Sequence, residues 1–330
     1  MKPELDSREA LIFSNGVENG ALEEELRLAA EAGVRIVTLL DPEYPALLRT
    51  MPSPPPVLYV KGTLLQEDEA AVAMVGTRAA TPYGLGVAKR YAHELVRCGI
   101  TVVSGLAEGI DGAAHEGALA AGGRTIAVLG HGLNHLFPSI HRKLADRVAA
   151  SGALISEFPM GMPPLKHNFP RRNRLIAGLS LGVVVVEAPV RSGALITARE
   201  AAELGRDVFA VPGPVTSEAS RGCHRLIQDG AKLVEGVVDL LEEIAPRLKD
   251  QLRGWRESSA QADGESSPGV LQALSQEERL VYGAIPAGRT AMVDTLSGAT
   301  MLDPSKLLPL LTGLELKGFI KQIPGKGFSR

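Results

Sequence analysis

The sequence predicts an α/β protein with a doubly wound, mostly parallel Rossmann-like sheet, a short N-terminal helical segment and a C-terminal winged-helix module. Short apolar runs alternate with helical stretches from about residue 70 to about residue 245. The four valines at 183–186 form a run that is apolar at every position, which is typical of a strand buried on both faces. Such strands, separated by helices, form parallel sheets that are covered on both sides.

The elements of this sheet can be assigned in chain order. The strand candidates are Ala71–Val75, Ile100–Val103, Thr125–Leu129, Ala153–Ile155, Val183–Val186 and Asp207–Val211. The helix candidates lie near 83–97, 109–121, 140–150, 171–180 and 194–205. In a sheet of this kind ligands bind at the carboxyl ends of the strands, so the loops that follow the strands are the places to look for function.

The segments on either side divide the chain further. Residues 1–56 are expected to hold a short helical segment, which Gly33 ends, and a stiff Pro-rich linker at 51–56. An extended Rossmann-like domain then occupies 57–245, and the polar stretch 246–270 is a flexible linker. Residues 271–330 carry three helix candidates, 276–284, 290–298 and 304–317, and a glycine-containing hairpin, which favours a winged-helix module.

Composition excludes several classes of protein. The chain has 330 residues and a net charge of −3, so any binding of a polyanion must come from a local patch. Cys98 and Cys223 show no zinc spacing, and free thiols agree with a reducing cytoplasm. We expect no signal peptide, no membrane span and therefore no membrane partner. No metal or cofactor motif stands out, and no catalytic set of side chains does either.

The most informative stretch is 166–174, which reads Lys-His-Asn-Phe-Pro-Arg-Arg-Asn-Arg. It combines cations with an aromatic side chain and has no acidic residue. Arginine and lysine follow a phosphate backbone while bases stack on aromatic faces, so this pattern suits single-stranded nucleic acid. The candidate DNA-binding residues of this stretch are Lys166, Phe169, Arg171, Arg172, Asn173 and Arg174.

Three further loops carry phosphate-binding chemistry. A glycine turn that opens a helix exposes backbone N–H groups to an anion, and a nearby arginine adds charge. If the sheet is parallel, all of these loops lie at one edge of it. Their candidate DNA-binding residues are Gly76, Thr77 and Arg78, then Ser104 and Gly105, then Arg191, Ser192 and Gly193.

Structural roles compete with these assignments. The glycines could serve only the tight geometry of the turns. Arg174 could pair with Glu157 or Glu187, and Phe169 could be a core anchor. We expect His115 to pack or cap a helix, and Cys223-His224 to be structural, since no partner ligands occur at zinc spacing.

At these loops the chain closely resembles the DNA-processing protein A family (DprA, also called Smf). The matching strings include Met74-Val75-Gly76-Thr77-Arg78, Ser104 to Asp111, Pro164 to Ser180, Arg191 to Ala198, Asp207 to Gly213 and Gly222 to Ile227. The resemblance covers about residues 40–245. It implies that the helical segment in residues 1–56 is SAM-like, although the segment is short for a complete SAM-like domain. The same resemblance implies a cytoplasmic bacterial protein that binds single-stranded DNA as a homodimer, protects incoming DNA and loads RecA recombinase during natural transformation.

The resemblance also implies roles for single residues and partners. Arg78 and Lys166 match DNA-contacting positions and Phe169 a base-stacking position. The family often has a DNA-binding lysine where Ser139 follows Phe137-Pro138. His141, Arg142 and Lys143 lie just beyond Ser139 and are the candidates to replace it. The dimer and RecA contact falls on Ala202, His224 and Leu233. The expected partners are single-stranded DNA, RecA, a second copy of the chain and single-strand-binding protein.

Two alternative functions belong to other classes. Related Rossmann proteins resembling phosphoribohydrolases cleave nucleoside monophosphates with a Gly-Gly-x-Gly-Thr-x-x-Glu motif, of which Ser192–Glu200 keeps Thr-x-x-Glu but lacks the glycine before the threonine. The winged helix could instead bind duplex DNA. Residues 271–330 hold 7 bases and 5 acids, a weak charge for that task, so we favour a protein-contact role for the module.

Overall fold

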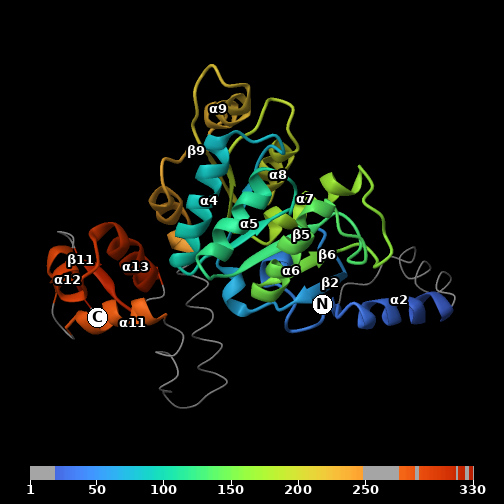
Figure 1. The fold of residues 1–330 in the computed structure, drawn as a ribbon, viewed down its shortest axis with the longest axis horizontal. Coiled ribbons are helices and arrows are strands. Elements are labelled where there is room, and N and C mark those ends of the chain that lie inside the picture. Colours follow the sequence, from blue (N-terminus) through green and yellow to red (C-terminus); the bar gives the residue numbers. More distant parts are fainter. Residues whose placement is uncertain (1–18, 248–274, 287–289, 317–318, 324–326, 330) are drawn as a thin grey trace, which may run out of the picture.

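The structure is a computed structural model that describes residues 19–247, 275–286, 290–316, 319–323 and 327–329. Its main body is a nine-stranded sheet with helices on both faces (Figure 1). The strands are β1 (Arg35–Thr38), β2 (Val57–Gly62), β3 (Ala71–Val75), β4 (Thr101–Ser104), β5 (Thr125–Leu129), β6 (Ala153–Ser156), β7 (Gly182–Val185), β8 (Asp207–Ala210) and β9 (Lys232–Leu233). The Rossmann-like, mostly parallel fold expected from the sequence is therefore confirmed.

The strands lie in the order β1-β2-β6-β5-β4-β3-β7-β8-β9. Every neighbouring pair from β6 to β9 is parallel. The chain therefore winds outward from β3 in both directions, and the loops after β3, β4, β6 and β7 emerge at one edge of the sheet. This arrangement follows from strands whose residues are buried on both faces, as β3, β4, β5, β6 and β7 are.

Strands β1 and β2 were not predicted from the sequence. β2 pairs antiparallel with β6, and β1 pairs antiparallel with β2. The expected boundary at residue 56 thus falls between two paired strands, and the Pro-rich stretch 51–56 connects them. Met51 is buried within this stretch, so the stretch packs against the sheet domain as a connection between neighbouring strands.

Helices of the sheet domain form two layers. On one face α4 (Pro82–Arg97), α5 (Ile110–Ala120) and α6 (Arg142–Ser151) bury residues such as Met74, Tyr91 and Val148. On the other face the helices pack around Leu48, Ile176 and Ala198. Those helices are α3 (Ala46–Arg49), α7 (Asn168–Gly178), α8 (Gly193–Glu203) and α9 (Arg221–Gln228). Before the sheet lies α2 (Asn19–Glu31), which ends close to Gly33 as expected.

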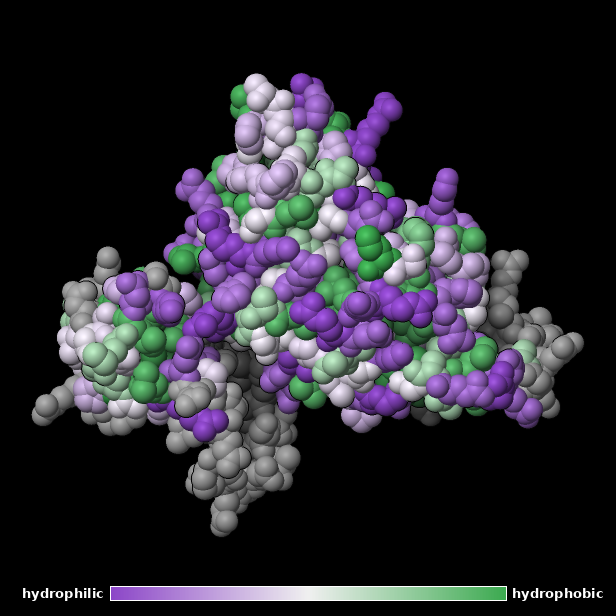
Figure 2. All heavy atoms as spheres, viewed as in Figure 1, coloured by the Kyte–Doolittle hydropathy of each residue, from purple (hydrophilic) through white to green (hydrophobic). Residues whose placement is uncertain are grey.

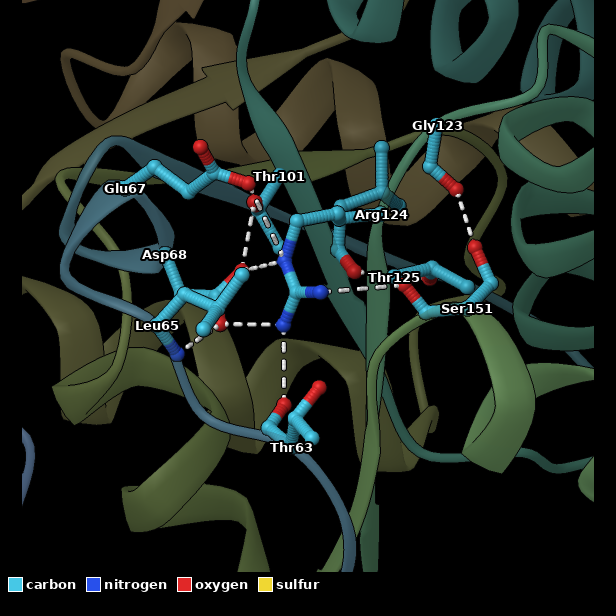
Figure 3. A network of polar contacts seen from close by, with 10 residues as sticks. Thr63, Leu65, Glu67, Asp68, Thr101, Gly123, Arg124, Thr125 and Ser151 are labelled. Atoms are coloured by element: carbon cyan, nitrogen blue, oxygen red, sulfur yellow. Dashed lines mark hydrogen bonds and ion pairs between the residues drawn. The ribbon is translucent and has the colours of Figure 1, made fainter. Parts of the chain in front are cut away.

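A network of charged and polar side chains connects segments at the amino ends of the parallel strands (Figure 3). The loops after β3, β4, β6 and β7 lie at the opposite edge of the sheet. The guanidinium of Arg124 donates to both carboxylate oxygens of Asp68, each at 2.7 Å, and to the carbonyl oxygen of Thr63 at 2.8 Å. Asp68 also accepts a hydrogen bond from the hydroxyl of Thr101, at the start of β4. Because Arg124 directly precedes β5, the network joins the β2–β3 connection to the central strands.

The C-terminal residues form a winged-helix module, as expected. Its own core includes Val281, Leu296, Leu311 and Phe328. The elements are α11 (Gln276–Ala284), β10 (Ala291–Met292), α12 (Val293–Thr300), α13 (Pro304–Leu316), β11 (Lys321–Ile323) and β12 (Gly327–Ser329). Most of the expected linker 246–270 and the first 18 residues lie outside the described residues.

Hydrophilic side chains cover much of the sheet domain in one view, with apolar surface between them, and the module shows an apolar patch in the same view (Figure 2). None of the helices in the described part of the chain is long and apolar enough to cross a membrane.

Candidate nucleic-acid interface

Four loops meet at the carboxyl-end edge of the sheet, as the parallel topology requires. The backbone N–H of Thr77, after β3, donates to the carbonyl oxygen of Glu187, after β7, at 2.7 Å. The N–H of Ile110, at the end of the loop after β4, donates to the carbonyl oxygen of Thr77. These contacts confirm the expectation that the loops share one edge. The physical reason is that adjacent parallel strands place the loops that follow them side by side.

An aromatic and an arginine lie together at the centre of this edge. The guanidinium carbon of Arg78 lies 5.5 Å from the ring centroid of Phe169, within the range of a cation–π contact. The ring of Phe137 lies 6.0 Å from that of Phe169, at an interplanar angle of 44°. Arg78 is exposed, Phe169 is half-buried and Phe137 is 42% exposed. The three side chains therefore form a partly exposed platform with a positive charge over it.

Phe137 was missed as a site residue, although the sequence singled out the Phe137-Pro138 pair. It sits in the loop after β5, which has no lysine or arginine before Arg142. The signal in the sequence was an aromatic residue before a proline. Only the fold shows that the ring of Phe137 is exposed and lies beside that of Phe169. Phe137 and Phe169 border a notch of about 30 Å³, which is far too small to enclose a nucleotide.

Further cations surround the platform. Lys166 and Arg171, at the start of α7, and Arg191, before α8, are exposed. The guanidinium of Arg171 lies over the ring of Phe158 at 5.3 Å, which holds the arginine at the surface. Arg142 and Lys143, in the first turn of α6, are exposed too, as is Ser139 before them. One acid, Glu108, is also exposed at the notch.

Arg172 points inward instead. It is 5% exposed, and one of its nitrogens donates to the carbonyl oxygens of Gly105 and Val128. Burial lowers its pKa to about 10, while the charge of Asp111 opposes that shift, so the guanidinium remains protonated at neutral pH. The structure favours a supporting role for Arg172 over the direct DNA contact that the sequence suggested.

Asp111 completes this buried layer. Its carboxylate accepts hydrogen bonds from the backbone N–H groups of Gly105, at 3.1 Å, and Ala107, at 3.4 Å. Burial raises the pKa of Asp111, and the charge of Arg172 acts in the opposite direction. Asp111 and Arg172, both buried, therefore fix the loop after β4 through hydrogen bonds to its backbone.

Asn173 and Arg174 also make structural contacts. The side-chain amide of Asn173 donates to the carbonyl oxygen of Gly193 at 3.3 Å, which ties α7 to the start of α8. Arg174 pairs with Glu157 and donates to the carbonyl oxygen of Ser53 at 2.6 Å. Of the two acids that the sequence offered as partners for Arg174, Glu157 is the one it contacts.

Three small residues of the predicted site serve packing. A Cβ atom on Gly76 would lie 2.4 Å from the side chain of Ile110, and one on Gly105 would lie 2.6 Å from that of Arg172. Ser104 is fully buried, and its hydroxyl donates to the carbonyl oxygen of Met74 at 2.6 Å. The tight-geometry alternative thus accounts for Gly76 and Gly105, and the buried hydrogen bond of Ser104 gives that residue a packing role as well.

The helix N-termini are less free than expected. The side chain of Thr81 caps α4, and the carboxylate of Glu187 accepts hydrogen bonds from both the N–H and the hydroxyl of Thr81. Ser192 caps α8 by accepting from the N–H of Ala194. Among the described residues, no side chain caps α7, which begins beside Lys166. In the first turn of α7, however, the N–H of Asn168 donates to the carbonyl oxygen of Leu165, and Pro170 has no N–H. The start of α7 therefore offers a phosphate few backbone donors, and the α4 N-terminus already faces a negative charge.

The residues expected at a dimer or RecA contact lie around α8, α9 and β9, next to the end of the edge that carries Arg191. Ala202 is exposed and lines a groove of about 1030 Å³. Leu233 is 42% exposed on β9, the edge strand of the sheet. His224 is half-buried, and its Nε2 is 3.0 Å from the carbonyl oxygen of Gly213.

Comparison with known protein families assigns both the sheet domain and the C-terminal module to families. A family described as DNA recombination-mediator protein A matches residues 35–245, and a DprA winged helix domain matches residues 265–326. The chain belongs to the DNA recombination-mediator protein A family. The resemblance noted in the sequence is therefore confirmed.

Relatives of the family match over most of the chain. Protein Smf from Synechocystis is 38% identical over 314 residues, which cover 88% of this chain and 78% of that protein. A putative DNA processing protein DprA from Mycobacterium tuberculosis is 40% identical over 317 residues, which cover 92% and 79%. Both matches extend beyond the sheet domain.

Solved structures of the family share the fold. DprA from Streptococcus pneumoniae aligns with a TM-score of 0.64 at 42% identity, over 69% of this chain and 78% of that one. DNA processing protein A from Helicobacter pylori aligns with a TM-score of 0.58 at 30% identity, over 66% and 98%. The Helicobacter pylori structure concerns the single-stranded DNA binding mode of that protein.

Proposed function

We propose that this chain is a non-enzymatic, single-stranded DNA-binding recombination mediator that protects incoming DNA in the bacterial cytoplasm and loads RecA during natural transformation. The observation that carries the proposal is the partly exposed Phe169 ring beneath the Arg78 guanidinium, with exposed cations around it. A base stacks on such a ring, while the cations neutralise the phosphates on either side of it.

The shape of the edge favours single strands over other ligands. Duplex DNA keeps its bases stacked inside, so an aromatic platform of this kind has no base face to receive from it. The Ser192–Glu200 stretch of the phosphoribohydrolase alternative lies along the groove of about 1030 Å³ and not at the notch beside Phe169. Thr197 of the Thr-x-x-Glu stretch is buried inside α8, 1% exposed, where it cannot meet a substrate.

Assembly belongs to the same proposal. We place the homodimer and RecA contacts on the α8–α9–β9 side, which carries Ala202, His224 and Leu233. The groove that Ala202 lines begins at Arg191, Ser192 and Gly193, so this side adjoins one end of the DNA-binding edge. Support comes from the family resemblance and from the apolar Leu233 exposed on the edge strand β9. Single-strand-binding protein is proposed as a further partner, at a surface that we do not assign.

The test compares single- and double-stranded DNA binding by fluorescence anisotropy. The Phe169→Ala, Lys166→Ala double variant is expected to weaken single-strand binding for every sequence tested, with a stacking loss of about 1–3 kcal/mol per base. Lys89→Ala is the matched control, because Lys89 is an exposed lysine of α4 that pairs with Glu116. Unchanged single-strand affinity in the double variant would refute the assignment of this edge.

RecA loading and the absence of catalysis need separate readouts. The chain is expected to speed RecA filament formation on single strands coated with single-strand-binding protein, and Leu233→Arg is expected to reduce that effect while single-strand affinity is kept. Incubation with nucleoside monophosphates is expected to release no free base. Release of base that depends on Glu200 would support the enzyme alternative instead.

A further inference from the structure

Helix α13 of the winged-helix module contacts the sheet domain through a proline and a glycine. The sulfur of Cys98, directly after α4, lies 3.5 Å from the carbonyl oxygen of Pro309. A Cβ atom on Gly313 would have three atoms of Cys98 as its nearest neighbours, the first at 3.4 Å. Pro309 and Gly313 are four residues apart, so they share one face of α13. That face lies against the end of α4.

An ion pair joins the same two units. Arg97, in the last turn of α4, pairs with Glu277, in the first turn of α11. An arginine at a helix C-terminus and a glutamate at a helix N-terminus each also complement the helix dipole. A crevice of about 410 Å³ lies between the contacts, bordered by Val96, Gly122 and Leu310. The module therefore meets the sheet domain at two helix ends, and Figure 1 shows α13 on the side of the module nearer to that domain.

The contact face is separate from the module's own core. Leu307, Leu310, Leu311 and Leu314 of α13 pack into that core. At about 100° per residue, Pro309 and Gly313 are turned by about 100° or more around the helix from Leu307, Leu311 and Leu314. The module can therefore keep its fold whether or not the α13 face is covered.

The composition of α13 is poorly suited to reading DNA. Its sequence is Pro-Ser-Lys-Leu-Leu-Pro-Leu-Leu-Thr-Gly-Leu-Glu-Leu, with one lysine and no arginine, asparagine or glutamine. Those three absent residue types make most of the specific contacts to base edges in the major groove, and lysine and arginine make the phosphate contacts. In winged-helix and helix-turn-helix proteins that bind duplex DNA, a recognition helix supplies these groups.

We propose that the α13 face of the winged-helix module is a docking surface for the end of α4 in the same chain, and that the full chain does not use this helix to read duplex DNA. The docked module leaves the candidate DNA-binding edge open. Helix α4 has 16 residues and is therefore roughly 24 Å long. Its first turn lies beside that edge and its last turn beside the module. The proposal does not depend on single-strand binding.

The two cysteines allow a direct test in the full chain. Neither forms a disulfide; Cys98 is 3% exposed beside the module, and Cys223 is fully buried under β7 and α9. Gly313→Phe places a bulky ring against Cys98 without entering the module core. We expect a thiol reagent to modify one cysteine per chain at least tenfold faster in this variant than in the wild type. Gly313→Ala is the matched control and should behave like the wild type, because its Cβ makes an ordinary contact.

A charge swap repeats the test without changing the packing. Arg97→Glu and Glu277→Arg are each expected to speed the modification of Cys98 by up to about fivefold, because an exposed ion pair contributes about 1 kcal/mol at most. The double variant, with the two charges exchanged, is expected to restore the protection of Cys98. Restoration distinguishes loss of docking from loss of folding, since a misfolded module would not recover. A wild-type rate equal to that of Gly313→Phe, or single reversals without effect, would overturn docking.

The second half of the proposal has its own measurement. Lys306 is the lysine of α13 and is exposed. Lys306→Glu is expected to leave duplex DNA affinity of the full chain unchanged in fluorescence anisotropy. A severalfold loss of duplex affinity would show that α13 contacts duplex DNA and would refute this part.

Discussion

The arginines at the DNA-binding edge divide into exposed and structural ones, and this division predicts different responses to salt. Arg78 is exposed over Phe169, whereas Arg174, close by in sequence to Phe169, is paired with Glu157. Arg78→Ala removes a cation that is free to meet a phosphate. Arg174→Ala removes one that is already neutralised by a carboxylate. The two substitutions delete the same side chain, so each is the control for the other.

The magnitude is worked from four of the six exposed cations around the platform, those on the connections after β3, β6 and β7, which are Arg78, Lys166, Arg171 and Arg191. Should each neutralise one phosphate of a single strand, together they contribute about −2.8 to the slope of log affinity against log salt, at about −0.7 per contact. A rise from about 50 to 200 mM salt then weakens wild-type binding about 50-fold, but Arg78→Ala only about 20-fold. Arg174→Ala should keep the wild-type slope.

The assay is fluorescence anisotropy with a labelled oligothymidine at four or more salt concentrations. Arg174→Ala is also expected to lower the free energy of unfolding by about 3 kcal/mol, because it leaves the carboxylate of Glu157, 8% exposed, without its partner. Urea denaturation measures that loss. A slope that falls equally in both variants, or in Arg174→Ala alone, would refute the division into phosphate-binding and structural arginines.

Three further predictions concern the fold and the platform. Arg124→Met should lower the free energy of unfolding, measured by urea denaturation, by about 3 kcal/mol, because the carboxylate of Asp68 is then buried without its cation. A loss below about 1 kcal/mol, the value of an exposed ion pair, would contradict a stabilising role for this network. Burial lowers the pKa of His115 to about 3 from 6.5, so the unfolded state binds the extra proton below pH 6.5 and stability falls with acidification. The wild type should lose about 2 kcal/mol from this group between pH 7 and pH 5, and His115→Gln should lack that contribution; equal pH slopes would disprove it. Gly130→Ala places a Cβ 2.9 Å from the Phe169 ring, and the displaced ring should bind a single strand about threefold more weakly by anisotropy, whereas unchanged affinity would separate ring position from binding.

The structural role of His115 could be predicted from the sequence, but its hydrogen bonds could not. It was expected to pack or cap a helix, and it lies fully buried in α5. Its Nδ1 is 2.7 Å from the hydroxyl of Thr125, which itself donates to the carbonyl oxygen of Val102. Nδ1 therefore carries the proton, and Nε2 has no hydrogen-bond partner within the described residues. No pattern in the sequence predicts that arrangement, because Thr125 and Val102 belong to two other elements.

The sequence by itself determined the parallel sheet and the location of the loops. Strands buried on both faces must be apolar throughout, so β3 and β5 could be placed at their observed bounds from hydrophobicity alone. The edge shared by the loops followed, because parallel strands all end on the same side. Strands β1 and β2 could not be placed in this way, since a peripheral antiparallel pairing is decided by which neighbour the chain returns to.

Tertiary structure alone decided which cations of 166–174 face solvent. In the sequence Arg171, Arg172 and Arg174 carry the same charge, and only Arg174 has an ion-pair alternative, with two acids to choose from. Helix α7 turns about 100° at each residue, so its neighbours in sequence point to different sides. Arg171 reaches the surface, Arg172 enters the layer with Asp111, and Arg174 meets Glu157. The sequence identified a cationic, aromatic stretch, and the packing of α7 against the sheet selected the residues that are free to bind.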